Sequence, residues 1–390
     1  MHLTRKEEQI YEGEHGWAEQ TCMEILVRLG ELFGATRLIP IESAHISGVS
    51  YKTLGDSPAE FLQALARTGA QSKVRATLNP QSFDPEYMCQ RIPRWTIRRQ
   101  SRIIRQFEKM GLTASLTCTP YYLQKPKPKS HLAWAESSAV VYANSVLGAS
   151  TNREGGPSAL AAAIIGKTPN YGMHRTENRQ PNILVQMSTK METETDFGVL
   201  GIHLGRILKE EIPSIQGLTA ATHERLKQLG AALATTGMTN MFLQDNQPTE
   251  KGAEKITVET QDLRETREQL TTITTEKPDL VFIGCPHCSE DEIRQVSKLI
   301  GDKKVRTDVE LWICTSRYVK RRTGKYSGII EESGGHVLTD MCPIVSYTEK
   351  FGIRTIATNS AKTAYYAPTL NRADVHLAPL QECLKKAVEE

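Results

Sequence analysis

From residue 279 onward, short apolar runs alternate with longer segments in which apolar and polar residues are mixed. The apolar runs predict buried strands, and the mixed segments predict helices. The five predicted strands span residues 279–284, 308–314, 336–340, 353–357 and 374–378. Alternation of this kind is typical of a parallel sheet with helices on its faces, so we expect an α/β fold.

The earlier part of the chain shows similar elements in a less regular order. Helices are expected at 4–34, with an interruption near Gly13 and Gly16, and then after Ser57, from about 138 to 147, after Ser158, at 197–208 and at 223–235. Strands are expected at 38–41, 73–77, 114–117, 131–134 and 183–187. The polar segments 43–50 and 245–255 are expected to be loops. We predict three regions: an N-terminal α/β region (1–115), a central α/β region (116–260) and a C-terminal βαβ domain (261–390).

The composition narrows the class of protein. The chain has 390 residues, of which 39% are hydrophobic and 24% charged, as in ordinary globular proteins. A net charge of +3 is too small to indicate a nucleic-acid-binding protein. There is no apolar run of about 18 residues, so we expect no membrane span, and the charged N-terminus does not read as a secretory signal. We therefore expect a cytoplasmic protein whose eight cysteines are reduced thiols or metal ligands.

Three of these cysteines directly follow predicted strands. They are Cys118, Cys285 and Cys342, and each precedes a proline or a Thr-Pro pair. Ligands of open α/β sheets bind at the carboxyl ends of strands, and the last predicted sheet brings two of these thiols and Lys362 to one edge. Thiolates from three separate loops suit an iron–sulfur cluster that protein binds incompletely. An open iron can act as a Lewis acid on a substrate hydroxyl, which points to a hydro-lyase.

Other readings of the same residues remain open. Cys285 and Cys288 form a C-x-x-C pair, which also suits a non-catalytic zinc-binding protein or a thiol oxidoreductase. The basic segment 91–109 reads either as a solvated helix face or as a contact for an anionic substrate or an acidic partner. The Gly-rich turn 151–158 suits either an anion held by backbone N–H groups or close packing of the helix that follows.

Four motifs considered together carry a family resemblance. They are Gly284-Cys-Pro-His287, Cys118-Thr-Pro-Tyr121, Asp340-Met-Cys-Pro343, and Asn144-Ser-Val-Leu-Gly-Ala149 with Thr151-Asn-Arg-Glu-Gly-Gly-Pro-Ser158. Over nearly its whole length the chain resembles the aconitase X family. The resemblance implies a multidomain α/β body of the aconitase superfamily, with parallel or mixed sheets flanked by helices. It also implies a small swivelling domain, which in many archaeal members is a separate subunit, and this chain resembles the separate large subunit.

The resemblance implies one of two dehydrations. The first converts (R)-5-phosphomevalonate, a phosphorylated hydroxy acid of the archaeal mevalonate pathway, to trans-anhydromevalonate 5-phosphate and water. The second acts on cis-3-hydroxy-L-proline. We expect the first, because a separate large subunit resembles the archaeal arrangement. We also expect a heterodimer with the small subunit and an inactive large subunit alone, since the active site of the superfamily closes between body and swivelling domain.

The resemblance also implies roles for individual residues. Cys118, Cys285 and Cys342 would hold an iron–sulfur cluster, expected to be [4Fe-4S] with one open iron. Substrate contacts would come from strand-end loops, at Gly48, Val49, Ser50, Asn79, Pro80, Glu136, Ser137 and Lys362. Lys362 would pair with a substrate carboxylate or phosphate, and Glu136 is the carboxylate expected to act as an acid or base. Cys288 stands outside this set.

Overall fold

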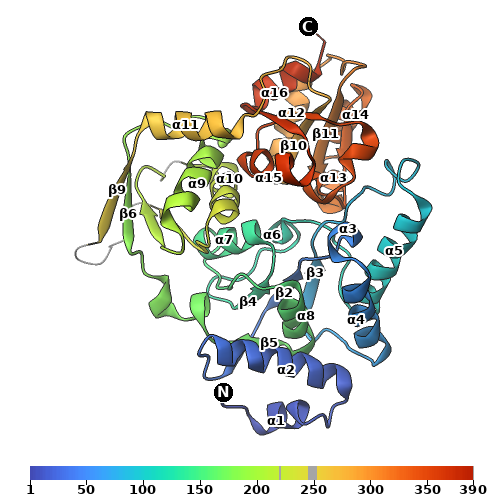
Figure 1. The fold of residues 1–390 in the computed structure, drawn as a ribbon, viewed down its shortest axis with the longest axis vertical. Coiled ribbons are helices and arrows are strands. Elements are labelled where there is room, and N and C mark those ends of the chain that lie inside the picture. Colours follow the sequence, from blue (N-terminus) through green and yellow to red (C-terminus); the bar gives the residue numbers. More distant parts are fainter. Residues whose placement is uncertain (219–220, 245–252, 390) are drawn as a thin grey trace. The chain divides into compact units, whose positions relative to one another are not determined.

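The computed structural model describes residues 1–218, 221–244 and 253–389. Most of the predicted surface loop at 245–255 lies outside the described residues. The chain forms two compact units (Figure 1). Unit 1 comprises residues 1–81 and 93–180, and unit 2 comprises residues 82–92 and 181–390. The mixed α/β class is confirmed, and the predicted region boundaries at 115 and 260 stay predictions.

Unit 1 begins with helices α1 (Arg5–Tyr11) and α2 (Trp17–Leu32), which confirms the predicted interruption. Gly13 and Gly16 both lie in it with positive φ, a conformation that glycine adopts without steric cost. Strand β1 (Leu38–Pro40) then pairs antiparallel with β5 (Lys167–Pro169). The remaining helices of the unit are α3 (Tyr51–Leu54), α4 (Asp56–Arg67), α5 (Arg94–Lys109), α6 (Pro120–Leu123), α7 (Ser137–Ser145) and α8 (Gly156–Ile165).

The central sheet of unit 1 has three parallel strands in the order β3-β2-β4. They are β2 (Ser43–Ile46), β3 (Arg75–Leu78) and β4 (Leu132–Trp134). Two predictions were wrong here. Residues 43–46 form the middle strand rather than a loop, and the predicted strand at 114–117 is irregular; the residue before it, Thr113, makes an isolated bridge to Thr77.

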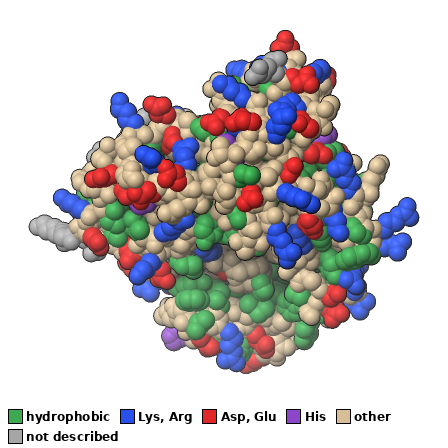
Figure 2. Space-filling view, turned by 45° about the horizontal axis from the view of Figure 1, so that its top comes forward, with side chains coloured by type: hydrophobic (Ala, Val, Ile, Leu, Met, Phe, Trp, Pro, Cys, Tyr) green, Lys and Arg blue, Asp and Glu red, His purple; other side chains and the backbone are tan. Residues whose placement is uncertain are grey.

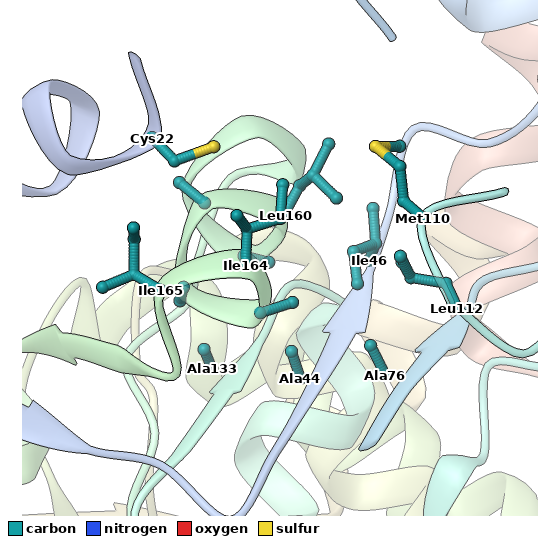
Figure 3. Close-up of a cluster of buried hydrophobic side chains, with 14 of the residues drawn as sticks. Cys22, Ala44, Ile46, Ala76, Met110, Leu112, Ala133, Leu160, Ile164 and Ile165 are labelled. Carbon is teal, nitrogen blue, oxygen red and sulfur yellow. The ribbon is translucent and has the colours of Figure 1, made fainter. Parts of the chain in front are cut away.

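A row of alanines explains how α8 packs on this sheet. Ala44, Ala76 and Ala133 are paired in register on the three strands, and Figure 3 shows Ala44 and Ala133 facing Ile164 and Ile165 of α8, whereas Ala76 lies nearer to Leu112. Small side chains let the helix approach the strands closely. Because side chains alternate along a strand, the next row, His45, Thr77 and Trp134, points to the opposite face.

Unit 2 contains the five-stranded parallel sheet that the sequence predicts, in the order β12-β11-β10-β13-β14. Its strands are β10 (Leu280–Cys288), β11 (Glu310–Thr315), β12 (His336–Leu338), β13 (Thr355–Thr358) and β14 (Asp374–Leu377). Its helices are α12 (Glu290–Ile300), α13 (Arg317–Arg322), α14 (Gly324–Glu332), α15 (Ala361–Leu370) and α16 (Leu380–Ala387). Every residue of the central strand β10 is buried, which agrees with its unbroken apolar start.

Unit 2 also contains a four-stranded parallel sheet in the order β8-β7-β6-β9. Its strands are β6 (Ile183–Met187), β7 (Pro213–Ile215), β8 (Leu243–Gln244) and β9 (Glu254–Val258). The accompanying helices are α9 (Glu194–Leu208), α10 (His223–Thr236) and α11 (Thr260–Leu270). Helices α9 and α10 pack closely because Gly201 and Gly205 of α9 lie against the backbone of α10; a Cβ on Gly201 would lie 2.5 Å from the carbonyl oxygen of Leu229.

Residues 82–92 belong to unit 2, although unit 1 precedes and follows them in the chain. The Asp84 carboxylate accepts a hydrogen bond from the Thr339 backbone N–H at 2.8 Å, and the Tyr87 hydroxyl donates to Glu310 at 2.7 Å. Phe83 and Met88 of this segment are buried. The segment thus packs with β11 and the end of β12.

The surface carries both signs of charge. Acidic and basic side chains are interspersed over the face shown in Figure 2, in keeping with the small net charge. None of the helices in the described part of the chain is long and apolar enough to cross a membrane.

Candidate active site

The predicted substrate residues of unit 1 lie at one edge of its central sheet. Gly48–Ser50 follow β2, Asn79 and Pro80 follow β3, and Glu136 and Ser137 follow β4. Because the three strands are parallel and adjacent, their carboxyl ends meet at this edge. The Asn79 amide nitrogen donates a hydrogen bond to the Glu136 carboxylate at 2.8 Å, so two of the predicted residues contact each other.

His45, which the sequence analysis did not single out, contacts Asn79 of the Asn79–Glu136 pair. It is fully buried, with its Nε2 3.4 Å from Asn79 Oδ1 and its Nδ1 2.8 Å from the Thr77 hydroxyl. Since the Asn79 amide nitrogen faces Glu136, its oxygen must accept from His45, which places the proton on Nε2. Burial lowers the pKa of His45 from 6.5 to about 4, although the Glu136 charge and the Asn79 hydrogen bond oppose the shift. His45 is therefore a neutral donor at pH 7.

Glu136 is held from its other side by the helix it begins. It is the N-cap residue of α7, where its Oε1 accepts hydrogen bonds from the Ser138 hydroxyl at 3.0 Å and the Ser138 backbone N–H at 3.5 Å. A carboxylate at a helix N-terminus is stabilised by the helix dipole. Hydrogen bonds that connect His45, Asn79, Glu136 and Ser138 in series thus fix the direction of the Glu136 carboxylate.

Residues 47–50, the β2 loop, connect β2 to α3. Gly48 has φ +71°, and the Ser50 hydroxyl is buried without a hydrogen-bond partner among the described residues. A Cβ on Gly156, the first residue of α8, would lie 2.7 Å from the Ser47 carbonyl oxygen. Of the two readings of the Gly-rich turn, the structure therefore favours close packing, here against the β2 loop.

Cys118 lies at the same edge of unit 1. The residue before it, Thr117, donates its backbone N–H to the carbonyl oxygen of Leu78 at 3.0 Å, at the end of β3. Ser115 bonds the same residue through its hydroxyl, which donates to the Leu78 carbonyl and accepts from the Leu78 N–H at 3.1 Å each. This segment replaces the predicted strand 114–117, and it places Cys118 next to the position of Asn79.

The other predicted residues lie at the carboxyl edge of the five-stranded sheet in unit 2. Cys285 is in β10, Cys342 precedes a short 3₁₀ helix (Pro343–Val345) after β12, and Lys362 is in the first turn of α15 after β13. The His287 Nε2 donates to the Met341 carbonyl oxygen at 2.8 Å, which ties the Cys285 segment to the Cys342 segment. Asn371 donates to the Pro343 carbonyl oxygen at 2.9 Å. The carbonyl groups on both sides of Cys342 are therefore held by buried side chains.

A buried ion pair between Lys227 and Glu292 contacts the segment that contains Cys285. Lys227 of α10 is 1% exposed; its Nζ contacts the Glu292 carboxylate and lies 3.1 Å from the His287 carbonyl oxygen. Glu292 also accepts the Ser289 backbone N–H at 2.7 Å, while the Ser289 hydroxyl accepts from the Glu292 N–H. Ser289 and Glu292 thus form a capping box at the start of α12, and Lys227 neutralises its carboxylate.

Cys288 differs from the three predicted ligands. It is fully buried, and burial together with the nearby Glu292 raises the pKa of its thiol. Metal ligation and disulfide exchange both need the thiolate, so this environment disfavours Cys288 as a zinc ligand or redox thiol. None of the eight cysteines, all of which the structure describes, is in a disulfide.

Comparison with known proteins places the whole chain in one family. Family models described as the first, second and third domains of aconitase X match residues 1–177, 181–268 and 278–389. The chain belongs to the aconitase X family. The second and third of these family domains together make up most of unit 2.

Relatives of full length are among the matches. The chain is 43% identical to the phosphomevalonate dehydratase large subunit of Methanocaldococcus jannaschii, over 99% of this chain and 100% of the relative. It is 32% identical to a cis-3-hydroxy-L-proline dehydratase of Pseudomonas aeruginosa, of which it covers 69%. The crystal structure of Thermococcus kodakaraensis aconitase X in its holo-form matches with a TM-score of 0.92 and 41% identity, over 99% of this chain and 100% of that chain.

The donor set of this aconitase X chain fits an iron–sulfur cluster in its chemistry. Cys118 and Cys342 are partly exposed and in no disulfide, and Cys285 is a reduced thiol at the carboxyl end of a strand. Within the described residues, no three or more His, Cys, Asp or Glu side chains form a group that could hold a metal ion. Cys118 belongs to unit 1, whereas Cys285 and Cys342 belong to unit 2. The ligand set therefore stays a prediction.

Three supporting residues were missed because their roles depend on partners far away in sequence. His45 contacts residues 32 and 34 positions away, and Lys227 contacts residues 60 and 65 positions away. The third, Gln100, binds the β2 loop from 49 and 51 positions away. One weak signal existed for His45, which lies one residue before the end of a strand that leads into a polar loop.

Proposed function

We propose that this chain is the large subunit of a phosphomevalonate dehydratase. It would convert (R)-5-phosphomevalonate to trans-anhydromevalonate 5-phosphate and water, together with a small swivelling subunit. The observation that carries the proposal is the extent of the match. The chain covers 100% of the large subunits of M. jannaschii and of Thermococcus kodakarensis, but only 69% of the cis-3-hydroxy-L-proline dehydratases of P. aeruginosa and Hypocrea jecorina.

Dehydration of a hydroxy acid has two chemical requirements. A hydroxyl group must leave one carbon, and a base must take a proton from the neighbouring carbon. A cluster held by Cys118, Cys285 and Cys342 would supply Lewis-acid stabilisation of the departing oxygen when bound. These three cysteines are in no disulfide, and this together with the buried protonated thiol at Cys288 supports the ligand set.

The other residues would bind and orient the substrate. Glu136 is the carboxylate that we assign to proton transfer, because Asn79 and Ser138 fix its two oxygens. Lys362 is partly buried at the start of α15 and would pair as an ammonium group with a substrate carboxylate or phosphate. The Ser50 hydroxyl is buried and has no hydrogen-bond partner in the described part of the chain, so it is suited to a substrate oxygen, and the same strand ends would be lined by Gly48, Val49, Pro80 and Ser137.

A direct test compares the two family substrates. The chain is co-expressed with its small subunit without oxygen, supplied with iron and sulfide, and assayed with (R)-5-phosphomevalonate and cis-3-hydroxy-L-proline. Turnover of the phosphate ester is expected. Turnover of the imino acid alone would contradict the proposed substrate and favour the second family activity. Full activity of the chain without its small subunit would contradict the proposed heterodimer.

Cysteine variants test the ligand set against the zinc and redox alternatives. Cys118→Ala and Cys342→Ala are expected to lose the visible absorbance of the cluster and its iron, whereas Cys288→Ala should keep both. The matched variant is informative because Cys288 lies only three residues from Cys285. Loss of bound metal in Cys288→Ala, with normal metal content in Cys118→Ala, would reject the proposed ligands. The predicted cytoplasmic location stays a prediction.

A further inference from the structure

Helix α5 holds the β2 loop through one side chain. Gln100 is 1% exposed; its Nε2 donates to the Val49 carbonyl oxygen at 2.9 Å, and its Oε1 accepts the Tyr51 backbone N–H at 2.7 Å. We propose that Gln100 is a positioning residue for substrate binding, because its amide bonds the backbone on both sides of Ser50. This inference rests on the proposed function.

The two hydrogen bonds are those that a neighbouring strand would give to this backbone. After β2 ends at Ile46, the chain leaves the sheet, and the peptide groups around Ser50 lose their strand partners. A buried peptide group needs a hydrogen bond, and a side-chain amide supplies one donor and one acceptor at the required spacing. Gln100 therefore fixes the backbone of Ser50 rather than its side chain.

The consequence appears at the Ser50 hydroxyl. That group is buried and has no hydrogen-bond partner among the described residues, although Ser50 lies between two backbone groups that are both bonded. A buried hydroxyl without a partner is unfavourable in the free protein. A substrate oxygen would supply the missing partner, and the direction of the hydroxyl is set by the backbone that Gln100 holds.

The loop is braced from two further sides. Gly156 of α8 packs against the Ser47 carbonyl oxygen, as described above. On the solvent side, the Arg99 guanidinium lies 5.2 Å from the Tyr51 ring centroid and 5.3 Å from that of Trp95. This stacking assigns a packing role to one of the arginines in the basic segment 91–109. The neighbouring position on the helix, Gln100, then points inward to the loop.

The test uses Gln100→Leu, which keeps most of the side-chain volume and removes both hydrogen bonds. In the complex with the small subunit, KM for (R)-5-phosphomevalonate should rise at least tenfold while kcat changes less than threefold, because the loop contacts are made in the bound substrate and in the transition state alike. In the substrate-free chain, deuterium exchange of the Tyr51 amide should become at least tenfold faster. Gln106→Leu is the matched control: Gln106 is also buried on α5, but its Nε2 bonds the carbonyl oxygen of Arg102 in its own helix.

The outcomes separate this inference from the proposed function. Faster exchange with an unchanged KM would overturn the positioning role, and so would equal losses of activity in Gln100→Leu and Gln106→Leu. Gln100→Glu keeps an acceptor for Tyr51 but no donor for Val49, and its KM should lie between those of wild type and Gln100→Leu. A wild-type complex that turns over no phosphomevalonate would contradict the proposed function, and the exchange rates would still decide whether Gln100 holds the loop.

Discussion

The buried ion pair beneath the Cys285 segment gives a stability prediction whose size follows from the structure. In Lys227→Met, the Glu292 carboxylate keeps its burial and its hydrogen bond from the Ser289 backbone N–H but loses its counter-ion, and the His287 carbonyl oxygen loses its lysine donor. Removal of one partner of a buried pair costs about 3–5 kcal/mol. For a unit of this size, each kcal/mol lowers Tm by about 2–4 °C. We therefore expect Tm to fall by about 6–20 °C.

Calorimetry of the purified chain measures this shift, with two variants as controls. Arg264→Met breaks an exposed pair with Glu268 in the same unit, and it should change stability by less than about 0.5 kcal/mol. Lys227→Met combined with Glu292→Gln removes both charges and keeps an oxygen for Ser289, so it should recover part of the loss. A Tm for Lys227→Met within 1–2 °C of wild type, on the order of the Arg264→Met effect, would refute the reasoning.

Three further predictions concern the candidate site. The pKa of His45 is about 4 in the folded protein, below its usual 6.5, so the unfolded chain binds more protons between these values and stability falls as the pH drops through this range. His45→Gln should remove about 2 kcal/mol of the stability loss between pH 7 and pH 5, measured from urea midpoints; equal losses in both proteins would exclude a buried neutral imidazole. Gly156→Ala should cost about 1–3 kcal/mol, because its Cβ would overlap a β2-loop carbonyl, whereas Gly155→Ala, with 3.7 Å to its nearest neighbour, should be nearly silent in the same measurement. Lys362→Met should raise KM for the anionic substrate at least tenfold, and an unchanged KM would remove Lys362 from the site.

The pattern of apolar residues predicted the five-stranded sheet well because parallel strands buried on both faces leave continuous apolar runs. Leu280–Ile283 and Leu311–Ile313 are of this kind. The middle strand of unit 1 has no such run. Ser43-Ala-His-Ile46 places a small residue on the face covered by α8 and a histidine on the other, so its composition suggests a loop. Only the pairing with β3 and β4 makes it a strand.

The opposite error occurred at 114–117, where the residue types suit a strand but the backbone does not. Leu116 has φ +45°, which no regular strand contains, and only Thr113 makes a bridge to β3. The position of the adjacent Cys118 was nevertheless predicted at a strand end, and the structure places it beside the end of β3. The prediction was therefore right that Cys118 lies at the end of a strand, but the strand is β3 rather than residues 114–117.

Some residues at the candidate site could be predicted from the sequence, and others could not. Those at strand ends, such as Asn79 and Glu136, are found because topology alone gathers them. Gln100 and Lys227 lie in the middle of helices, and each acts on a backbone group that is distant in sequence. Neither residue type nor spacing marks such a position, because the same side chains in a helix most often face water.

Residues 82–92 belong to unit 2, and this affects how the chain folds during synthesis and where it can be truncated. During synthesis, unit 1 is complete in sequence at residue 180, but β11 and β12, which receive the 82–92 segment, have not yet been translated. Asp84 and Tyr87 therefore lack their hydrogen-bond partners, Thr339 and Glu310, until the rest of unit 2 has been made. A polypeptide cut after residue 180 would carry the 82–92 segment permanently without these partners.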